Sequence, residues 1–327
     1  MFLPIGMMIC LTPPYPPSPL IESIEFDPPD RIILKAEGSD NWPITWGDDD
    51  CLYTAYGDGW GFEPKVERKL SLGLAKIIGF PPDFKGVNIR SPTGERTGDG
   101  PKGPKASGML MVDGLLYMWV RNVGNSMLMW SEDHGLTWRE GFRFRISFGC
   151  PTFLNFGRNY EGARDEYVYI YSQDGPSAYE PYDGVVLARV HKSRIREREA
   201  YEFFAGLDEE GRPVWTKEIR ERRPVFVFSG HCERLDVVYN PGLKRYLMAL
   251  GFNHKGGWGI FDAPEPWGPW TTAFFTERWD CGDTHSYRIP SKWISRDGRT
   301  FYLVFSGRGR YDAFCVRRAT VKLRGDR

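Results

Sequence analysis

Three consecutive aspartates, Asp48 to Asp50, stand directly before an apolar and aromatic segment, Cys51 to Tyr56. The leucine, threonine and tyrosines of this segment suit a half-buried sheet surface, so the sequence predicts a strand. Carboxylates at the mouth of a buried strand are costly unless they are paired, hydrated or used in chemistry. We therefore expect Asp49 or Asp50 to act on a substrate, with Asp48 binding beside them. The alternative is that the trio caps a turn.

A further carboxylate, Glu233, precedes another predicted strand, Leu235 to Tyr239. Hydrolysis of a glycosidic bond requires two carboxyl groups, one protonated and one ionised. The sequence predicts that Glu233 forms such a pair with Asp49 or Asp50. The alternatives for these acidic residues are an ion pair of Glu233 with Arg234 or Arg288 and a structural role for Asp236.

Other polar and aromatic residues lie at comparable positions, beside predicted strands. Three of the five histidines are among them, which favours a polar floor that faces the substrate. A metal site formed by these histidines is the alternative, but we expect none. The expected substrate-binding residues are Trp46, Asp48, Arg121, His231, His254, His285, Arg288 and Arg308. Trp60 and Trp258 are expected as further stacking platforms.

Composition excludes several classes of function. The chain has 43 basic and 43 acidic side chains, whereas a nucleic-acid-binding protein needs a basic surplus or stripe. No apolar run approaches the ~18 residues that would span a membrane. P-loop, dinucleotide-binding, HExxH and GxSxG motifs do not occur, so no cofactor is expected. We expect a monomer that binds a carbohydrate substrate.

Six widely scattered cysteines include no CxxC pair, so zinc binding is not expected. We expect mostly free, buried thiols, with disulfides as the alternative in an exported protein. The apolar start, Met1 to Cys10, lacks a basic region and a small-residue cleavage site. A secreted or periplasmic location is slightly favoured over a cytoplasmic one.

One unit recurs along the chain: a strand, a short glycine turn and an aromatic strand, followed by one or two more strands. Five such units begin near residues 46, 106, 149, 232 and 286, a spacing that fits propeller blades. The sequence thus predicts an all-β, five-bladed β-propeller, with a β-sandwich as the alternative. Residues 1–38 would form a leader and first strand, and residues 39–327 a single propeller domain. Lys192 to Phe204 is the one predicted helix, and Pro81 to Pro104 a long loop.

Two turn motifs indicate the kind of propeller. Ser131 to Trp138 (SEDHGLTW) matches the pattern SxDxGxTW, the Asp box of sialidase-type propellers, for which we expect a structural role. Ala263 to Trp270 (APEPWGPW) resembles the GPW turn that closes a blade in glycoside hydrolases of family 43. With Asn41 to Phe62 (NWPITWGDDDCLYTAYGDGWGF), these segments are similar to the family of domain of unknown function 4185, across most of residues 40–320.

Members of that family resemble five-bladed propeller glycosidases, and some act as endo-D-arabinanases. The resemblance implies a sugar-cleaving site on the propeller axis and an arabinan-type substrate. Glu233 stands where the acid of family 43 would stand. The function expected is therefore that of a glycoside hydrolase active in polysaccharide degradation.

Tyr287 to Pro290 also resembles the YRIP motif of sialidases, whose arginine grips a substrate carboxylate. Here the motif follows the Asp box instead of preceding it, and a triad of arginines cannot be assigned from the sequence. Two alternatives to the hydrolase stay open. One is a non-catalytic carbohydrate-binding propeller, and the other is a lyase or sialidase-like enzyme that acts on an acidic sugar.

Overall fold

The computed structural model describes residues 11–253 and 255–326, and the fold over these residues is all-β. The helical segments of this part of the chain are single 3-10 turns. None of the described helices is long and apolar enough to cross a membrane. The 3-10 turns are η1 (Pro29–Arg31), η2 (Gly100–Lys102), η3 (Arg158–Tyr160), η4 (Lys192–Arg194), η5 (Arg198–Ala200), η6 (Ile219–Glu221), η7 (Ser291–Trp293) and η8 (Gly309–Tyr311).

The strands form four sheets. The first contains β3 (Ile44–Trp46), β4 (Leu52–Tyr56), β5 (Gly73–Ile78) and β6 (Lys85–Ile89). The second contains β7 (Lys105–Val112), β8 (Leu115–Arg121), β9 (Ser126–Ser131) and β10 (Arg139–Phe144). A five-stranded sheet contains β21 (Thr284–Arg288), β22 (Thr300–Gly307), β23 (Phe314–Leu323), β1 (Ile21–Phe26) and β2 (Ile33–Lys35).

The largest sheet has ten strands and divides at its one parallel pair, β11 (Thr152–Asn155) with β17 (Leu235–Asn240). On one side of this pair lie β12 (Tyr167–Gln173), β13 (Tyr182–His191), β14 (Glu202–Leu207), β15 (Pro213–Thr216) and β16 (Pro224–Cys232). On the other side lie β18 (Arg245–Asn253), β19 (Gly257–Ala263) and β20 (Thr271–Thr276). All other strand pairs named in these sheets are antiparallel.

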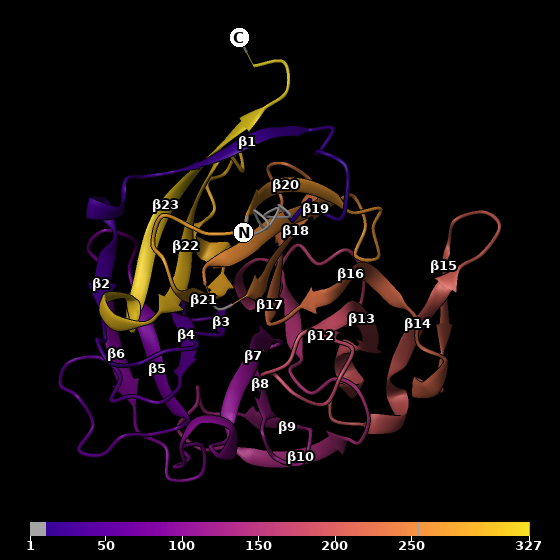
Figure 1. Cartoon of the computed structure of the whole chain (residues 1–327). Helices are drawn as coiled ribbons and strands as arrows, with labels where there is room; N and C mark the ends of the chain where they lie inside the picture. Colours follow the sequence, from indigo (N-terminus) through magenta and orange to yellow (C-terminus); the bar gives the residue numbers. More distant parts are fainter. Residues whose placement is uncertain (1–10, 254, 327) are drawn as a thin grey trace, which may run out of the picture.

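Five inner strands pack against one another: β3, β7, β17 and β21 lie at the centre of the molecule (Figure 1), and β11 contacts both β7 and β17. Their partners extend outward from them, so that β6, β10 and β20 lie toward the periphery (Figure 1). Polar side chains link the inner strands across the centre. Thr45 on β3 donates to Asn155 on β11 at 2.7 Å and accepts from the backbone of Met111 on β7 at 3.0 Å.

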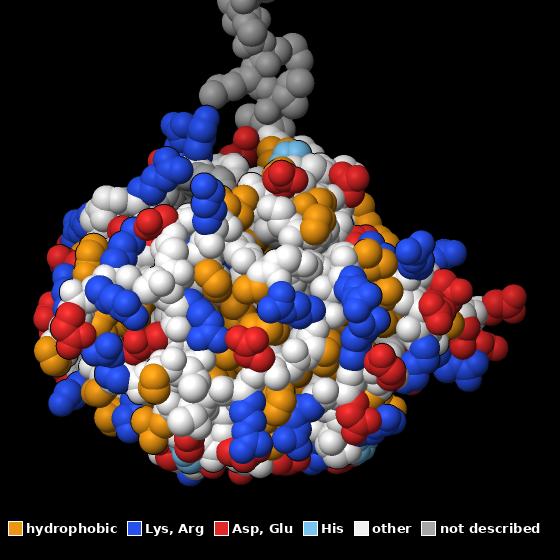
Figure 2. All heavy atoms as spheres, turned by 90° about the horizontal axis from the view of Figure 1, so that it is seen from below, with side chains coloured by type: hydrophobic (Ala, Val, Ile, Leu, Met, Phe, Trp, Pro, Cys, Tyr) orange, Lys and Arg blue, Asp and Glu red, His pale blue; other side chains and the backbone are white. Residues whose placement is uncertain are grey.

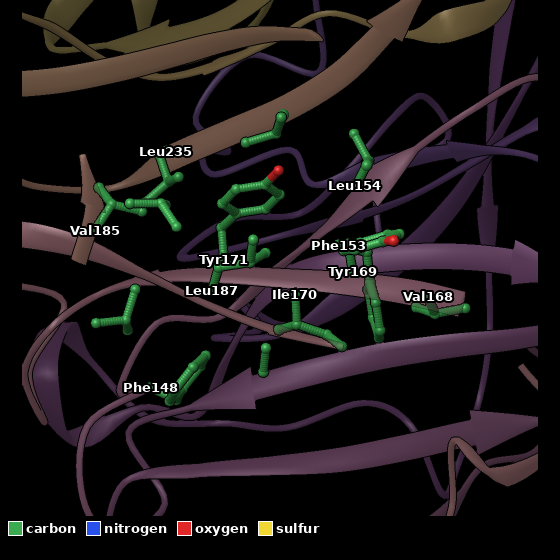
Figure 3. Packing of buried hydrophobic residues seen from close by; sticks show 14 of the residues in the cluster. Phe148, Phe153, Leu154, Val168, Tyr169, Ile170, Tyr171, Val185, Leu187 and Leu235 are labelled. Carbon is green, nitrogen blue, oxygen red and sulfur yellow. The ribbon is translucent and has the colours of Figure 1, made fainter. Parts of the chain in front are cut away.

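The core is built from the faces at which these sheets pack. The largest cluster of buried side chains joins residues from β7 through β19. Figure 3 shows part of it: Tyr171 and Leu187 are register partners on β12 and β13 and lie beside one another in the cluster. Every residue of β12 from Val168 to Gln173 is buried, so both faces of this strand lie within the core.

The strands β1 and β2, which come first in the chain, complete the last sheet. Ile24 of β1 pairs with Val321 of β23, and Leu34 of β2 pairs with Cys315 of the same strand. In Figure 1 the indigo β1 runs along the yellow β23. The long β23 therefore receives two strands from the other end of the chain on one side and β22 on the other.

Several local predictions need correction. The predicted helix Lys192 to Phe204 forms the turns η4 and η5 and then enters β14, because its charged residues lack a continuous apolar stripe. The predicted loop 81–104 contains the strand β6, an edge strand too polar to be recognised from its alternation. Most important for the site, 51–56 is not an innermost strand but the second strand of its sheet, β4.

Acidic and basic side chains intermix on the flank of the molecule shown in Figure 2, as expected from equal numbers of the two charges. The cysteines also agree with expectation, since all five that the structure describes are free thiols. Four of them are buried and Cys51 is half-buried. Cys10 lies outside the described residues.

Candidate functional site

The two ends of the inner strands present different sets of side chains. Near the start of the strands, Asn41 before β3 donates to the carbonyl of Ala106 in β7 at 2.6 Å. Beyond their far end, Arg158 after β11 donates to the carbonyl of Asp48 after β3. The inner strands thus run in the same direction, with an N-terminal mouth formed by residues that precede them and a C-terminal mouth formed by residues that follow them.

The three aspartates lie at the C-terminal mouth, on the turn between β3 and β4. Asp48 contacts His134 at 2.7 Å, Asp49 accepts from Tyr53 at 2.8 Å, and Asp50 contacts Lys292 at 3.0 Å. Hydrogen bonds from these donors outweigh burial and lower the pKa of Asp49 and Asp50 below the usual range. The trio therefore serves the turn and its neighbours.

Glu233 lies at the opposite end, because it directly precedes the inner strand β17. Asp49 and Asp50, in contrast, follow the inner strand β3 and therefore lie at the other end of the inner strands. The structure therefore does not bring Glu233 together with Asp49 or Asp50 across one site. The sequence prediction failed because the apolar β4 was taken as the innermost strand instead of the shorter β3.

Asp40, which the sequence analysis missed, occupies the N-terminal mouth just ahead of β3. Its backbone forms an antiparallel bridge with Gly57, with hydrogen bonds of 3.0 and 2.8 Å. A Cβ atom at Gly57 would lie 2.6 Å from Asp40 Oδ1, so a larger residue at this position would displace the Asp40 carboxyl group. The bridge places the next residue, Asp58, beside Asp40 at the mouth.

The carboxyl groups of Asp40 and Asp58 have different surroundings. Burial raises the pKa of Asp40 above the usual range, with a smaller contribution from the negative charge of Asp58; the cations Arg234, Arg121 and Lys105 oppose the shift. Asp58 forms an ion pair with the Nζ of Lys105, a buried side chain, at 2.7 Å. One carboxyl is thus held toward its protonated form, while the other has a cation to stabilise its charge.

Two buried arginines line the same mouth. Arg121 ends β8 opposite Lys105 of β7, and Arg234 precedes β17. Their guanidinium carbons lie 5.0 and 5.5 Å from the ring centre of Tyr179. Tyr179 comes from the loop between β12 and β13 and also accepts a hydrogen bond from Asn122 at 3.3 Å. Side chains from separate sheets therefore converge here.

Three further groups complete the mouth. The Nε2 atom of His285 lies 3.9 Å from Asp40 Oδ2. Asp312 has its pKa raised to about 6, first by burial and then by the negative charges of Asp40 and Asp58. Glu233 donates its backbone N–H to Gly251 at 3.1 Å. Perturbed carboxyl groups gathered in this way are typical of functional sites.

The remaining predicted residues are dispersed. Trp46 belongs to the C-terminal mouth, where its indole donates to Asp50 at 2.9 Å. His231 stacks on Phe228 at 4.5 Å in β16. Arg308 is exposed beyond β22. His254 lies outside the described residues.

Among the described residues, Arg288 of the YRIP segment forms polar contacts only with groups that belong to the inner strands. It is 1% exposed and donates to the carbonyls of Leu235 and Ser107 at 2.7 and 3.2 Å. It also pairs with Asp236 at 3.4 Å, as the structural role expected for Asp236 requires. Arg288 is therefore enclosed between inner strands and does not accompany His285 at the mouth.

The expected stacking platforms differ in position. Trp258 is fully buried and stacks on Tyr287 at 4.2 Å, so it belongs to the core. Trp60 is half-buried and packs against the cluster below β3 and β4. Neither geometry resembles an open sugar-stacking face.

The turn Ser131 to Trp138 is closed by its own side chains. Asp133 accepts from the backbone and hydroxyl of Thr137 at 2.8 and 2.6 Å. Trp138 donates from its indole to Gly135 at 3.0 Å and is buried. These contacts serve the hairpin and lie away from the N-terminal mouth.

Within residues 11–253 and 255–326, no group of three or more histidine, cysteine or acidic side chains is arranged to hold a metal ion.

Solved structures of similar fold support an all-β, propeller-type architecture. A presumed hydrolase from Bacteroides ovatus ATCC 8483 aligns with a TM-score of 0.55 and 14% identity, over 89% of this chain and 87% of that chain. The β-xylosidase RS223 aligns with a TM-score of 0.53 and 12% identity, over 89% and 95% of the chains. The α-L-arabinofuranosidase PaAbf62A from Podospora anserina, solved with cellotriose, aligns with a TM-score of 0.51 and 10% identity, over 94% and 98%.

At such identities the likeness concerns the fold alone. No curated protein sequence matches this chain significantly. The profile of the domain of unknown function DUF4185, in contrast, matches residues 108–317, which is more than half of the chain. The match begins in β7 and ends in β23, and thus extends over four of the five inner strands. The protein belongs to the DUF4185 family.

Proposed function

We propose that the protein is a glycoside hydrolase with a five-bladed propeller fold and its site at the N-terminal mouth. Five blades follow if the ten-stranded sheet is divided at the parallel pair β11 and β17, so that each inner strand begins one blade. In a propeller the inner strands surround an axis. Side chains that precede several inner strands then meet at one place.

The observation that carries this proposal is the difference in surroundings between two neighbouring carboxyl groups, those of Asp40 and Asp58. Burial raises the pKa of Asp40, which suits a general acid that protonates the leaving glycosidic oxygen. Asp58 is charge-paired with Lys105, which suits the carboxylate that activates water or attacks the sugar. Hydrolysis of a glycosidic bond requires two carboxyl groups, one protonated and one ionised.

Glu233 remains a candidate for the pair from the facing side of the mouth. His285, near Asp40, is suited to positioning a sugar hydroxyl or the carboxyl group itself. The glycosidase folds found among similar structures support this class of reaction, and arabinans and xylans are the first substrates to test.

The test is hydrolysis of arabinans, xylans and uronate polymers by the wild type and three variants, Asp40→Asn, Asp58→Asn and Glu233→Gln. We expect Asp40→Asn and Asp58→Asn each to lower the rate about 10²–10⁴-fold, the usual effect of losing a general acid or base. Unfolding temperatures serve as the folding control.

Full activity of Asp40→Asn would refute the assignment. A large loss in Glu233→Gln with none in Asp58→Asn would move the second role to Glu233. Glycan binding without hydrolysis by the wild type would favour a non-catalytic binding propeller.

A further inference from the structure

Of the four buried arginines among the described residues, two are paired with carboxylates. Arg288 pairs with Asp236 at 3.4 Å, and Arg317 pairs with Asp280 at 2.6 Å. Each of these guanidinium groups also donates to backbone carbonyls. This pairing is expected, because a buried charge without a partner costs several kcal/mol.

The other two, Arg121 and Arg234 at the N-terminal mouth, lack such a pair within the described part of the chain. Arg121 is 1% exposed and Arg234 is 9% exposed. No described carboxylate lies within 4 Å of either guanidinium. The Nε and Nη1 atoms of Arg121 have no hydrogen-bond partner among the described residues, and Arg234 donates from Nε to the carbonyl of Ala178 at 3.2 Å.

The surroundings of the two arginines leave positive charge uncompensated. The two cations repel one another, and this repulsion adds to burial in lowering the pKa of Arg234. Lys105 adds a third cation but is engaged by Asp58. Asp40 is the carboxyl that acts electrostatically on both arginines, and burial favours its neutral form. A ligand that brings negative charge would satisfy the unpartnered donors and offset this repulsion.

The arginine pair is close to the groups assigned to chemistry. Arg234 and Arg121 both act electrostatically on Asp40, whose side chain is 20% exposed. A planar guanidinium binds two oxygens of one oxyanion at once, which a lysine cannot do. The ring of Tyr179 lies beside both arginines and can hold them in a fixed orientation.

We propose that Arg121 and Arg234 bind an oxyanion substituent of the substrate, a carboxylate or a sulfate on the sugar next to the cleaved bond. This inference rests on the proposed function, because it uses the same mouth. It names the substrate class as an acidic glycan and not a neutral arabinan or xylan. The residues expected to select it are Arg121, predicted from the sequence, and Arg234, which was considered only as an ion-pair partner.

The test measures binding to the full-length protein without any turnover. Glucuronate and galacturonate are titrated by calorimetry at low salt, beside glucose, galactose and glucose 6-sulfate. We expect the acidic sugars to bind and the neutral sugars to bind at least about tenfold more weakly, since a desolvated charge pair contributes more than a neutral hydrogen bond. Binding of the uronates alone would identify the carboxylate, and binding of the sulfated sugar alone would identify the sulfate.

Variants then locate the site. Arg121→Met and Arg234→Met should each weaken acidic-sugar binding about tenfold or more. Arg212→Met is the matched control, because Arg212 is exposed on the loop between β14 and β15 and pairs with Asp208; it should bind as the wild type does. Arg234→Lys keeps the positive charge but not the planar guanidinium that binds two oxygens at once. It should therefore show an intermediate loss of acidic-sugar binding.

Equal binding of neutral and acidic sugars, or undiminished binding in both methionine variants, would overturn the inference. Failure of this inference can be separated from failure of the proposed function. Hydrolysis of neutral glycans without any binding of acidic sugars overturns only the arginine assignment. Binding of acidic sugars without hydrolysis of any glycan upholds that assignment and overturns only the catalytic one.

Discussion

Arg288 has two alternative roles, structural support within the fold and binding of a substrate carboxylate. The variant Arg288→Met distinguishes between them. Arg288→Met would remove the cation from a site that is 1% exposed and leave the buried Asp236 with the backbone N–H of Ile289 at 3.1 Å. It would also deprive the carbonyls of Leu235 and Ser107 of their donor. Breaking one side of a buried ion pair typically costs about 3–5 kcal/mol.

That cost can be converted into a melting temperature. An unfolding entropy of ~2.1 cal/mol/K per residue over 327 residues gives about 0.7 kcal/mol/K. The expected decrease in Tm is therefore about 4–7 °C, measured by calorimetry at neutral pH. The double variant Asp236→Asn with Arg288→Met should recover part of this loss, because it removes the uncompensated buried charge.

A sialidase-like role for Arg288 makes the opposite prediction. If this arginine gripped a substrate carboxylate, its loss would weaken ligand binding and leave the unfolding temperature nearly unchanged. A Tm within about 1 °C of the wild type, together with lost binding of acidic sugars, would refute the structural role derived from the contacts.

Three further predictions follow from the placement of other residues. Asp50→Asn at the C-terminal mouth should leave hydrolysis at the wild-type rate, and a loss as large as that of Asp40→Asn would show that the trio takes part in chemistry. Trp258→Ala should destabilise the fold by about 3–5 kcal/mol in chemical denaturation, because Trp258 is fully buried against Tyr287; an unchanged midpoint would contradict this. Burial raises the pKa of Asp312 to about 6, so this carboxyl favours the folded state at low pH, and the benefit is lost as the pH rises through 6. The Tm of Asp312→Asn should therefore increase relative to that of the wild type as the pH rises from about 4 to about 6. A Tm difference that stays constant over this range would contradict the raised pKa of Asp312.

The sequence predicted the all-β architecture well because alternation and turn chemistry are local. The Asp113-Gly114 turn joins β7 and β8 as expected, and all five predicted unit starts lie within three residues of the start of an inner strand. The helix prediction failed because its charged segment follows the sheet β12–β13 into two 3-10 turns.

The site was harder to predict, since it depends on which strand is innermost. An inner strand of three residues, β3, carries less apolar signal than its neighbour β4. The stronger apolar signal of β4 thus favoured a function for Asp48 to Asp50 over one for Asp40. The available signal was the isolated Asp40, which precedes an inner strand as Glu233 does, ahead of the Trp-Pro-Ile-Thr-Trp segment.

The sequence likewise does not show which of the buried arginines is paired with a carboxylate. Arg121 could be proposed from its place after a strand, but neighbours decide whether a buried cation is paired. Arg288 and Arg234 both lie near acidic residues in the sequence, yet only Arg288 has its carboxylate partner in space. Pairing between distant strands is set by the closed arrangement of the sheets and not by local sequence.

The pairing of β1 and β2 with β23 has a consequence for folding during synthesis. Ile21 and Leu323 are register partners separated by almost the whole chain, so the last sheet cannot form until β23 has been made. At a synthesis rate of ~5–20 residues per second, about 15–60 s pass between the synthesis of β1 and that of β23. During this time β1 lacks its partner strand. Closure over so long a loop is entropically costly and slow. During that interval the exposed strand edge can pair with other chains. We therefore infer that correct folding of the protein depends on how soon β23 is synthesised.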